Sequence, residues 1–243
     1  MLTLLHSSVH LFTRHASGRW PRAARQQGVT MIELLIVIVI VGIVSVLAAP
    51  SVNVMIQNGR IRTIAESVQN GLQLARANAV KRNTTVRFQL TSNLENTCVL
   101  STTSSNWVVS LSDPTGACDP TPAAGMALES VPPSIIQKRS GAEGGAANVT
   151  VTADASSRGV IGFSGLGRQI VVTNLDSTTT MSPVQPVSIN IQTSPATDCM
   201  PVAGAIVAVA GTIRCLRVVV SSYGQIGICD PSKSVGSPQG CPI

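Results

Sequence analysis

The chain has 243 residues, a formal net charge of +6 and an aromatic content of 2%. All three histidines and four of the arginines lie in the first 25 residues, so a charge of +2 remains beyond that segment. Without histidine, the remainder cannot build a Ser-His-Asp triad, a Cys-His pair or a His-ligated metal site. We therefore predict a protein that is not an enzyme and that has no cofactor and no metal site.

The most distinctive segment is an apolar stretch over residues 29–49. It contains one charged residue, Glu33. At about 1.5 Å per residue, a helix of this length spans roughly 30 Å, the thickness of a bilayer core. The segment before it is basic, and positive charge favours the cytoplasmic side of a membrane. We therefore predict a single membrane-spanning helix over residues 29–50, with the N-terminus in the cytoplasm and the C-terminal domain on the opposite side of the membrane.

The basic leader, Gly28, Glu33 and the apolar helix together resemble the signal of type IV pilins and type II secretion pseudopilins. The resemblance implies that residues 1–28 are a leader, that a prepilin peptidase cuts after Gly28, and that Val29 becomes the N-methylated first residue. Phenylalanine is usual at that position in the family. The resemblance also implies that Glu33 pairs with the α-amine of a neighbouring subunit during assembly. The alternative is an ordinary signal anchor with a stray glutamate.

Residues 51–83 are expected to continue the helix beyond the membrane. Polar side chains occupy one face, and apolar side chains at i, i+3, i+4 and i+7 spacing occupy the other. The apolar face comprises Ile61, Ile64, Ala65, Val68, Leu72, Ala75 and Ala79. Residues 74–83, with the sequence LARANAVKRN, resemble the end of this helix in the GspH/FimT branch of minor pilins.

After residue 83 the apolar period changes to two, which is typical of strands. Strands are expected at 85–90, 97–101, 106–111, 134–138, 148–152, 159–163, 169–173, 187–192, 205–210, 213–221 and 225–229. Residues 112–125 and 140–147 are expected to be exposed loops, and 177–186 and 194–204 also have turn composition. This order predicts an α+β fold that is type IV pilin-like: a long N-terminal helix packs on antiparallel β-sheet, and residues 84–243 form a β-rich domain.

Six cysteines all lie beyond the apolar stretch. An even count of cysteines in an exported domain favours disulfide bonds. The sequence contains no CxxC motif, which would have indicated a redox or zinc site. The sequence leaves the connectivity open. Sequential pairing closes three short loops and is the arrangement we expect: Cys98–Cys118, Cys199–Cys215 and Cys229–Cys241.

Some FimT-type relatives bind DNA through a Gly-Arg-x-Arg motif near the C-terminus. In the corresponding segment Gly224 is present, but Gln225 and Gly227 replace both arginines, so two phosphate contacts are lost. Residues 59–62 match the motif literally, but they lie on the long helix and we interpret the match as chance. The remaining candidates for DNA contact are Arg168, Arg214 and Arg217. Strand alternation over 213–221 places Arg214 and Arg217 on opposite faces of the expected strand.

Residues 162–167 are rich in glycine and contain Ser164. They do not form the G-x-S-x-G pattern of a nucleophile turn, and no helix pattern follows as a phosphate loop would need. We predict a tight hairpin at this point.

The resemblance predicts a minor pilin of a type IV pilus that helps to initiate or cap filament assembly. Its implied partners are other major and minor pilins through the N-terminal helix, the prepilin peptidase and the inner-membrane assembly platform. The protein would pass from the inner membrane into a pilus at the cell surface. Two alternatives stay open: a minor pseudopilin of a type II secretion system, and a DNA receptor for natural transformation.

Overall fold

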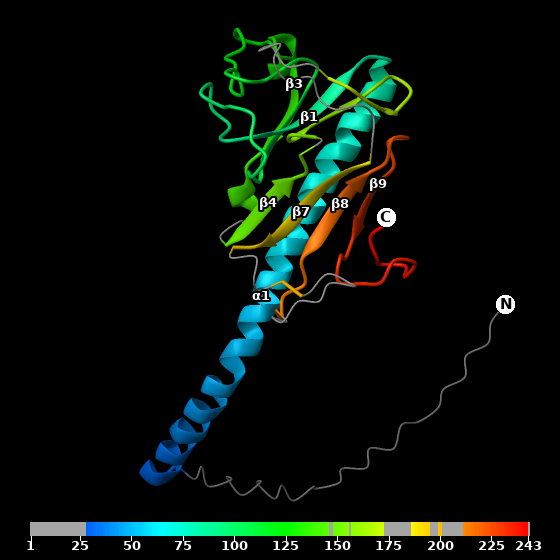
Figure 1. The fold of residues 1–243 in the computed structure, drawn as a ribbon. Helices are drawn as coiled ribbons and strands as arrows, with labels where there is room; N and C mark the ends of the chain where they lie inside the picture. Colours follow the sequence, from blue (N-terminus) through cyan, green and yellow to red (C-terminus); the bar gives the residue numbers. More distant parts are fainter. Residues whose placement is uncertain are drawn as a thin grey trace, which may run out of the picture. The chain divides into compact units, whose positions relative to one another are not determined.

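The computed structural model describes residues 28–145, 148–155, 157–172, 186–194, 199–200 and 211–242. The chain divides into two compact units, Met1–Leu47 and Ala48–Ile243. Helix α1 (Met31–Arg82) has residues in both units, and the described strands belong to the second (Figure 1). The α+β class expected from the sequence is confirmed.

In the second unit α1 is amphipathic. All seven side chains of the expected apolar face are at most 1% exposed, which confirms the helical period. On the opposite face Arg62 and Glu66 form an exposed ion pair of 2.8 Å, one turn apart. The Glu66 carboxylate raises the pKa of the Arg62 guanidinium, mainly by accepting its hydrogen bond and also by charge attraction.

The C-terminal end of α1 is closed by Asn83, whose φ of 49° is left-handed. The amide of Asn83 donates to the carbonyl of Val80 and that of Thr84 to the carbonyl of Ala79, both at 3.2 Å. These two bonds satisfy carbonyls that the helix leaves unpaired, as in a Schellman motif. The basic residues Lys81 and Arg82 in the last turn also suit the negative end of the helix dipole.

Two antiparallel sheets pack on α1, and their strands occur in the orders β3-β2-β1-β5-β6 and β4-β7-β8-β9. The first sheet comprises β1 (Val86–Thr91), β2 (Asn106–Ser110), β3 (Ile135–Arg139), β5 (Val160–Phe163) and β6 (Gln169–Ile170). The second comprises β4 (Val149–Ala153), β7 (Val187–Thr193), β8 (Leu216–Val220) and β9 (Ile226–Cys229). Two short 3₁₀ helices are η1 (Leu128–Ser130) and η2 (Gly141–Gly144).

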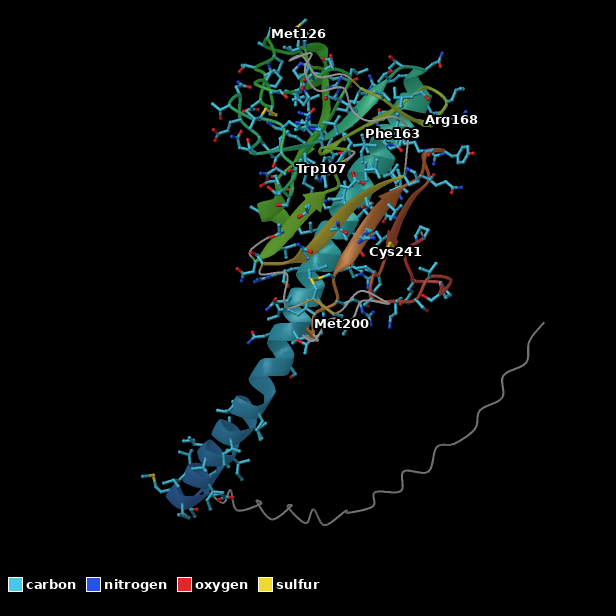
Figure 2. The ribbon with its side chains drawn as sticks, viewed as in Figure 1. Trp107, Met126, Phe163, Arg168, Met200 and Cys241 are labelled. Carbon is cyan, nitrogen blue, oxygen red and sulfur yellow. A yellow bond between two sulfur atoms is a disulfide. The ribbon has the colours of Figure 1, made fainter. Side chains whose placement is uncertain are left out.

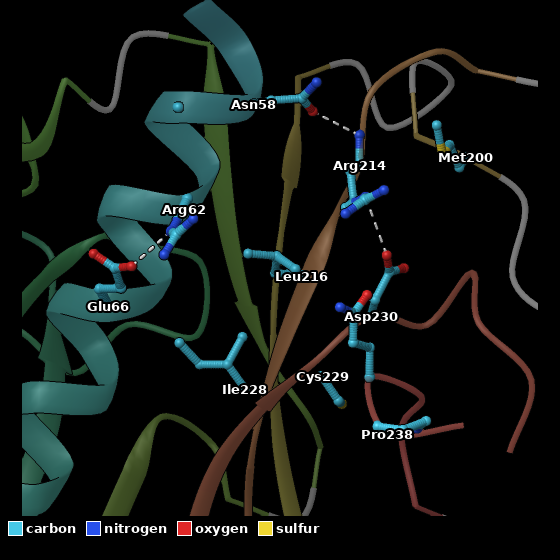
Figure 3. Close-up of a pocket in the computed structure, with 12 residues that line it drawn as sticks. Asn58, Arg62, Glu66, Met200, Arg214, Leu216, Ile228, Cys229, Asp230 and Pro238 are labelled. Atoms are coloured by element: carbon cyan, nitrogen blue, oxygen red, sulfur yellow. Dashed lines mark hydrogen bonds and ion pairs between the residues drawn. The ribbon is translucent and has the colours of Figure 1, made fainter. Parts of the chain in front are cut away.

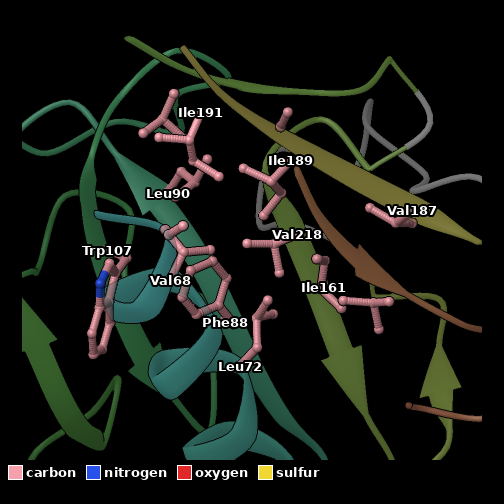
Figure 4. Packing of buried hydrophobic residues seen from close by; sticks show 14 of the residues in the cluster. Val68, Leu72, Phe88, Leu90, Trp107, Ile161, Val187, Ile189, Ile191 and Val218 are labelled. Atoms are coloured by element: carbon pink, nitrogen blue, oxygen red, sulfur yellow. The ribbon is translucent and has the colours of Figure 1, made fainter. Parts of the chain in front are cut away.

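The main core lies between α1 and the two sheets (Figure 4). Phe88 and Trp107 have ring centroids 5.7 Å apart, and the indole N–H of Trp107 donates to the hydroxyl of Ser67 at 3.0 Å. Gly71 lets α1 approach these rings, because a Cβ there would lie 2.8 Å from a ring carbon of Phe88. The helix and the first sheet are therefore fitted closely at this point.

Strand β1 is buried on both faces. Its outer face carries Arg87 and Gln89, which are covered by the segment that follows β2. Arg87 lies 3.9 Å from a carboxylate oxygen of Asp113, and the amide of Gln89 donates to Thr115 at 3.1 Å. Burial lowers the pKa of the Arg87 guanidinium, and the nearby Asp113 carboxylate partly offsets this. Residues 112–125 were expected to be an exposed loop, but they pack partly against this face.

The same outer face holds a second, smaller core. At the edge of this core, the ammonium of Lys138 donates to the carbonyl oxygen of Cys118 at 3.1 Å and to the carboxylate of Asp119 at 2.5 Å. The buried members of this core are Cys98, Val108, Cys118 and Ile135.

Several expected strands differ from the structure. Residues 97–101 form only one bridge, between Leu100 and Thr91, so a strand there was wrong. The expected strand over 169–173 is shortened to β6, and that over 213–221 begins only at Leu216. Part of the expected loop at 140–147 is the helix η2. The expected strand over 205–210 lies outside the described residues, as do most of 177–186 and 194–204.

The structure joins the cysteines sequentially, as Cys98–Cys118, Cys199–Cys215 and Cys229–Cys241. Replacing Cys98 and Cys118 together by alanine is expected to lower the free energy of unfolding by about 2–4 kcal/mol, because the loop that this bond closes regains its freedom in the unfolded chain. The matched double variant at Cys229 and Cys241, which frees a shorter loop, is expected to lose less. Urea unfolding without reductant measures both, and unchanged stability of the first variant would contradict the expectation.

Candidate assembly site

Helix α1 begins with an N-cap at Thr30. The side-chain oxygen of Thr30 accepts a hydrogen bond from the amide of Glu33 at 3.3 Å, and its carbonyl accepts one from the amide of Leu34 at 3.2 Å. Threonine followed three residues later by glutamate is the sequence signature of such a cap. Our interpretation of the sequence overlooked Thr30, although this spacing could have identified it. The cap holds Glu33 in the first turn, where a negative charge suits the helix dipole.

Gly28 and Val29 precede this helix. Both are exposed and lie outside regular secondary structure. The peptide bond between them is therefore two residues away from the start of α1 at Met31.

The first turns of α1 expose their apolar side chains. Met31 is 89% exposed, and each large apolar side chain from there to Leu47 is at least 51% exposed. Judged by length and composition, no single helix of the described residues qualifies as a membrane span, whereas the segments Met31–Leu47 and Ser51–Arg82 qualify as a pair. Exposed apolar surface of this extent is typical of sites that contact a membrane or another protein. The span over 29–50 stays a prediction.

The structure does not bring Arg168, Arg214 and Arg217 together. Arg168 follows β5 and stacks over the ring of Tyr223, with 5.4 Å between the guanidinium carbon and the ring centroid. Arg217 on β8 donates to the side chain of Asn190 at 2.7 Å. Arg214 precedes β8, while Tyr223 follows it, so the two lie at opposite ends of a strand about 17 Å long.

Arg214 lines a groove of about 650 Å³ between α1 and the strands β8 and β9 (Figure 3). Its amide donates to the side chain of Asn58 at 2.8 Å, and its guanidinium lies 3.3 Å from the carboxylate of the buried Asp230. The floor is apolar, with Leu216 and Ile228. Because Arg214 precedes β8, the expectation that it alternates with Arg217 on one strand was wrong. Its charge is already neutralised by a carboxylate of the same chain.

Gly224, the remaining glycine of the DNA-uptake motif, has a packing role here. Its φ is +79°, and a Cβ would lie 2.0 Å from the carbonyl oxygen of Gly167. That oxygen also accepts a hydrogen bond from the guanidinium of Arg76 at 3.0 Å. The glycine is therefore explained by close contact between two turns, without any role for nucleic acid.

Replacing Gly224 by alanine is expected to lower the free energy of unfolding by about 2 kcal/mol or more, because overpacking adds to the strain of positive φ. The matched control is Gly116→Ala, since Gly116 has a φ of +76° but open space around the new Cβ. The control is expected to lose only about 1 kcal/mol. Equal losses in thermal unfolding of the two variants would show that the contact with Gly167 contributes nothing.

Residues 162–167 form the hairpin that the sequence predicted. The amide of Ser164 donates to the carbonyl of Arg168 at 2.9 Å, and the amide of Gly167 donates back to Ser164 at 2.8 Å. Residues 59–62, which match the uptake motif, lie within α1, where Ile61 is fully buried.

Comparison with known proteins places the chain in a family. The model described as Type II transport protein GspH matches residues 65–197, and the prokaryotic N-terminal methylation motif matches residues 23–49. No curated protein matches the chain.

Two solved structures resemble the chain, both crystal forms of the type IV minor pilin FimU from Pseudomonas aeruginosa strain PAO1. Each is 16% identical, covers 74% of this chain and has a TM-score of 0.41; the match spans 98% of one FimU chain and 94% of the other. The family model, in contrast, spans more than half of this chain, and it follows the methylation motif, which covers the start of α1. The chain therefore belongs to the GspH family of type II transport proteins.

Proposed function

We propose that the chain is a minor subunit of a type IV pilus, which helps to initiate or cap the filament and has a structural rather than a catalytic role. Membership of the GspH family makes it a pilin- or pseudopilin-type subunit. The observation that carries the proposal is the methylation motif at the start of α1, which contains Gly28 and a single acidic residue, Glu33.

The first step is processing in the membrane. The prepilin peptidase would cut between Gly28 and Val29 and methylate the new α-amine of Val29. An exposed, non-helical bond next to a capped helix supports this step. The arginines before Gly28 favour the cytoplasmic side, so the C-terminal domain would lie in the periplasm.

The second step is docking of the processed subunit into the filament. The carboxylate of Glu33 would pair with the α-amine of a neighbouring subunit, while the exposed apolar side chains of Met31–Leu47 bundle with neighbouring helices. In a medium of low dielectric, opposite charges attract strongly and a lone charge is costly. The pair would therefore fix the axial register. Other pilins and the inner-membrane assembly platform are the partners that this step requires.

A second candidate is a minor pseudopilin of a type II secretion system, and membership of a family of type II transport proteins favours it. Deleting the gene and restoring it separates the two. A pilus subunit is expected to change the amount of sheared surface filaments and leave protein secretion unchanged. Loss of secretion with normal pili would replace our proposal by the second candidate.

The DNA-receptor alternative receives less support. Gln225 and Gly227 stand where the uptake motif has arginines. Arg214 and Arg217 are engaged by Asp230 and Asn190 of the same chain. A gel shift with the purified protein tests this alternative, and we expect no complex at moderate salt.

A further inference from the structure

The end of α1 and two neighbouring turns leave an exposed surface that is both apolar and cationic. We define the Tyr223 patch as Arg76, Val80, Leu166, Arg168 and Tyr223. Its three apolar members are highly exposed: 81% for Leu166, 69% for the chain's single tyrosine, and 51% for Val80. Figure 2 shows Arg168 near the C-terminal end of α1, well away from Met200 beside the groove.

The Tyr223 patch is held in shape by contacts beneath it. The guanidinium of Arg76 donates to the carbonyl of Gly167, and the amide of Gln169 donates to the carbonyl of Ser222 at 3.3 Å. The guanidinium of Arg168 lies over the Tyr223 ring. A surface that is already ordered loses little conformational entropy when it binds.

The two cations of the patch differ in exposure: Arg168 is exposed, and Arg76 is half-buried. Within the described part of the chain, neither Arg76 nor Arg168 forms an ion pair with a carboxylate. A complementary surface must therefore bring its own negative charge. Charge pairs of this kind contribute orientation and specificity more than affinity.

The composition of the patch distinguishes between classes of partner. Tyrosine and arginine are enriched in protein interfaces, where aromatic and apolar anchors carry most of the binding energy. Nucleic acid, in contrast, is bound mainly through many phosphate contacts, and this patch has two cations and two exposed aliphatic side chains. The observations favour a protein.

We propose that the Tyr223 patch docks the globular domain of a neighbouring pilin-type subunit, on a surface where a carboxylate lies beside apolar side chains. The identity of the partner rests on the proposed function; the binding surface itself does not. Leu166 and Tyr223 supply the apolar anchor, and Arg168 pairs with the partner's carboxylate.

Photo-cross-linking of the full chain in its own bacterium tests this. Benzoylphenylalanine is placed at position 166, or at position 235 as a control, because Val235 is also exposed, at 59%, but lies outside the patch. We expect position 166 to form an adduct with the globular domain of another pilin-type subunit, at least about fivefold more than position 235. Arg168→Glu should lower the yield by a similar factor, whereas Arg168→Lys should retain most of it.

Adducts are scored in whole cells by mass spectrometry, and free chain is measured separately in sheared filaments. Equal yields at the two positions, no adduct at either, an adduct that nuclease removes, or a yield unaffected by Arg168→Glu would each overturn the proposal. Absence of the chain from filaments counts instead against the proposed function, because the whole-cell adduct does not depend on it.

Discussion

The Glu33→Ala chain is expected to insert into the membrane and to be processed, yet to be nearly absent from filaments. The substitution removes the carboxylate that would pair with a neighbour's α-amine and leaves that amine unpaired among apolar helices. Breaking a buried ion pair by removing one partner is unfavourable by about 3–5 kcal/mol, and each 1.4 kcal/mol changes an equilibrium about tenfold. Incorporation should therefore fall by roughly a hundredfold or more.

Immunoblots of sheared filaments against whole-cell membranes measure this ratio. Glu66→Ala is the matched control, because Glu66 lies on the same helix in an exposed ion pair with Arg62. This substitution should leave incorporation into filaments nearly unchanged. Glu33→Gln tests the charge alone, since it keeps the shape of the side chain, and it should also fail to be incorporated. Normal amounts of the Glu33→Ala chain in filaments would refute the assembly role assigned to Glu33.

Trp107→Ala is expected to lower the free energy of unfolding by about 3–5 kcal/mol, as is typical when a large buried aromatic side chain is truncated. Trp107 is 1% exposed, packs against Phe88 and fills the space beside Gly71 on α1. Its removal leaves a cavity where the helix meets the first sheet, and it also leaves the hydroxyl of Ser67 without the indole N–H.

Thermal unfolding of the purified chain, with its disulfides intact, measures the effect. For a domain of this size the midpoint should fall by about 10 °C. Trp107→Phe is the matched control: it keeps most of the volume and removes the hydrogen bond, so a loss of about 1–2 kcal/mol is expected. A Trp107→Ala midpoint within about 1 °C of the unaltered chain would contradict the packing described here.

Features encoded by local periodicity could be predicted from the sequence. The buried face of α1 follows from the spacing of Ile61 to Ala79, and β7 alternates buried and half-buried residues along its length, as a strand on a core does. The hairpin at residues 162–167 follows from its glycines. In each case the signal lies within a few residues of the element that it specifies.

Features that depend on distant contacts were not predicted. Residues 97–101 are apolar enough for a strand, but Cys98 is bonded to Cys118 and the segment turns over the outer face of β1. Arg214 was assigned to a strand, whereas its amide bonds to Asn58 on α1, 156 residues earlier. Gly224 is required because its backbone lies against the carbonyl of Gly167, a residue far from it in the sequence. The capping role of Thr30, in contrast, was readable locally and was overlooked.

Mass spectrometry of the protein purified from its own membranes determines how the mature chain begins. We expect a chain that starts at Val29 with one methyl group on its α-amine. A chain that keeps the arginines before Gly28, or that starts at any other residue, would contradict this expectation.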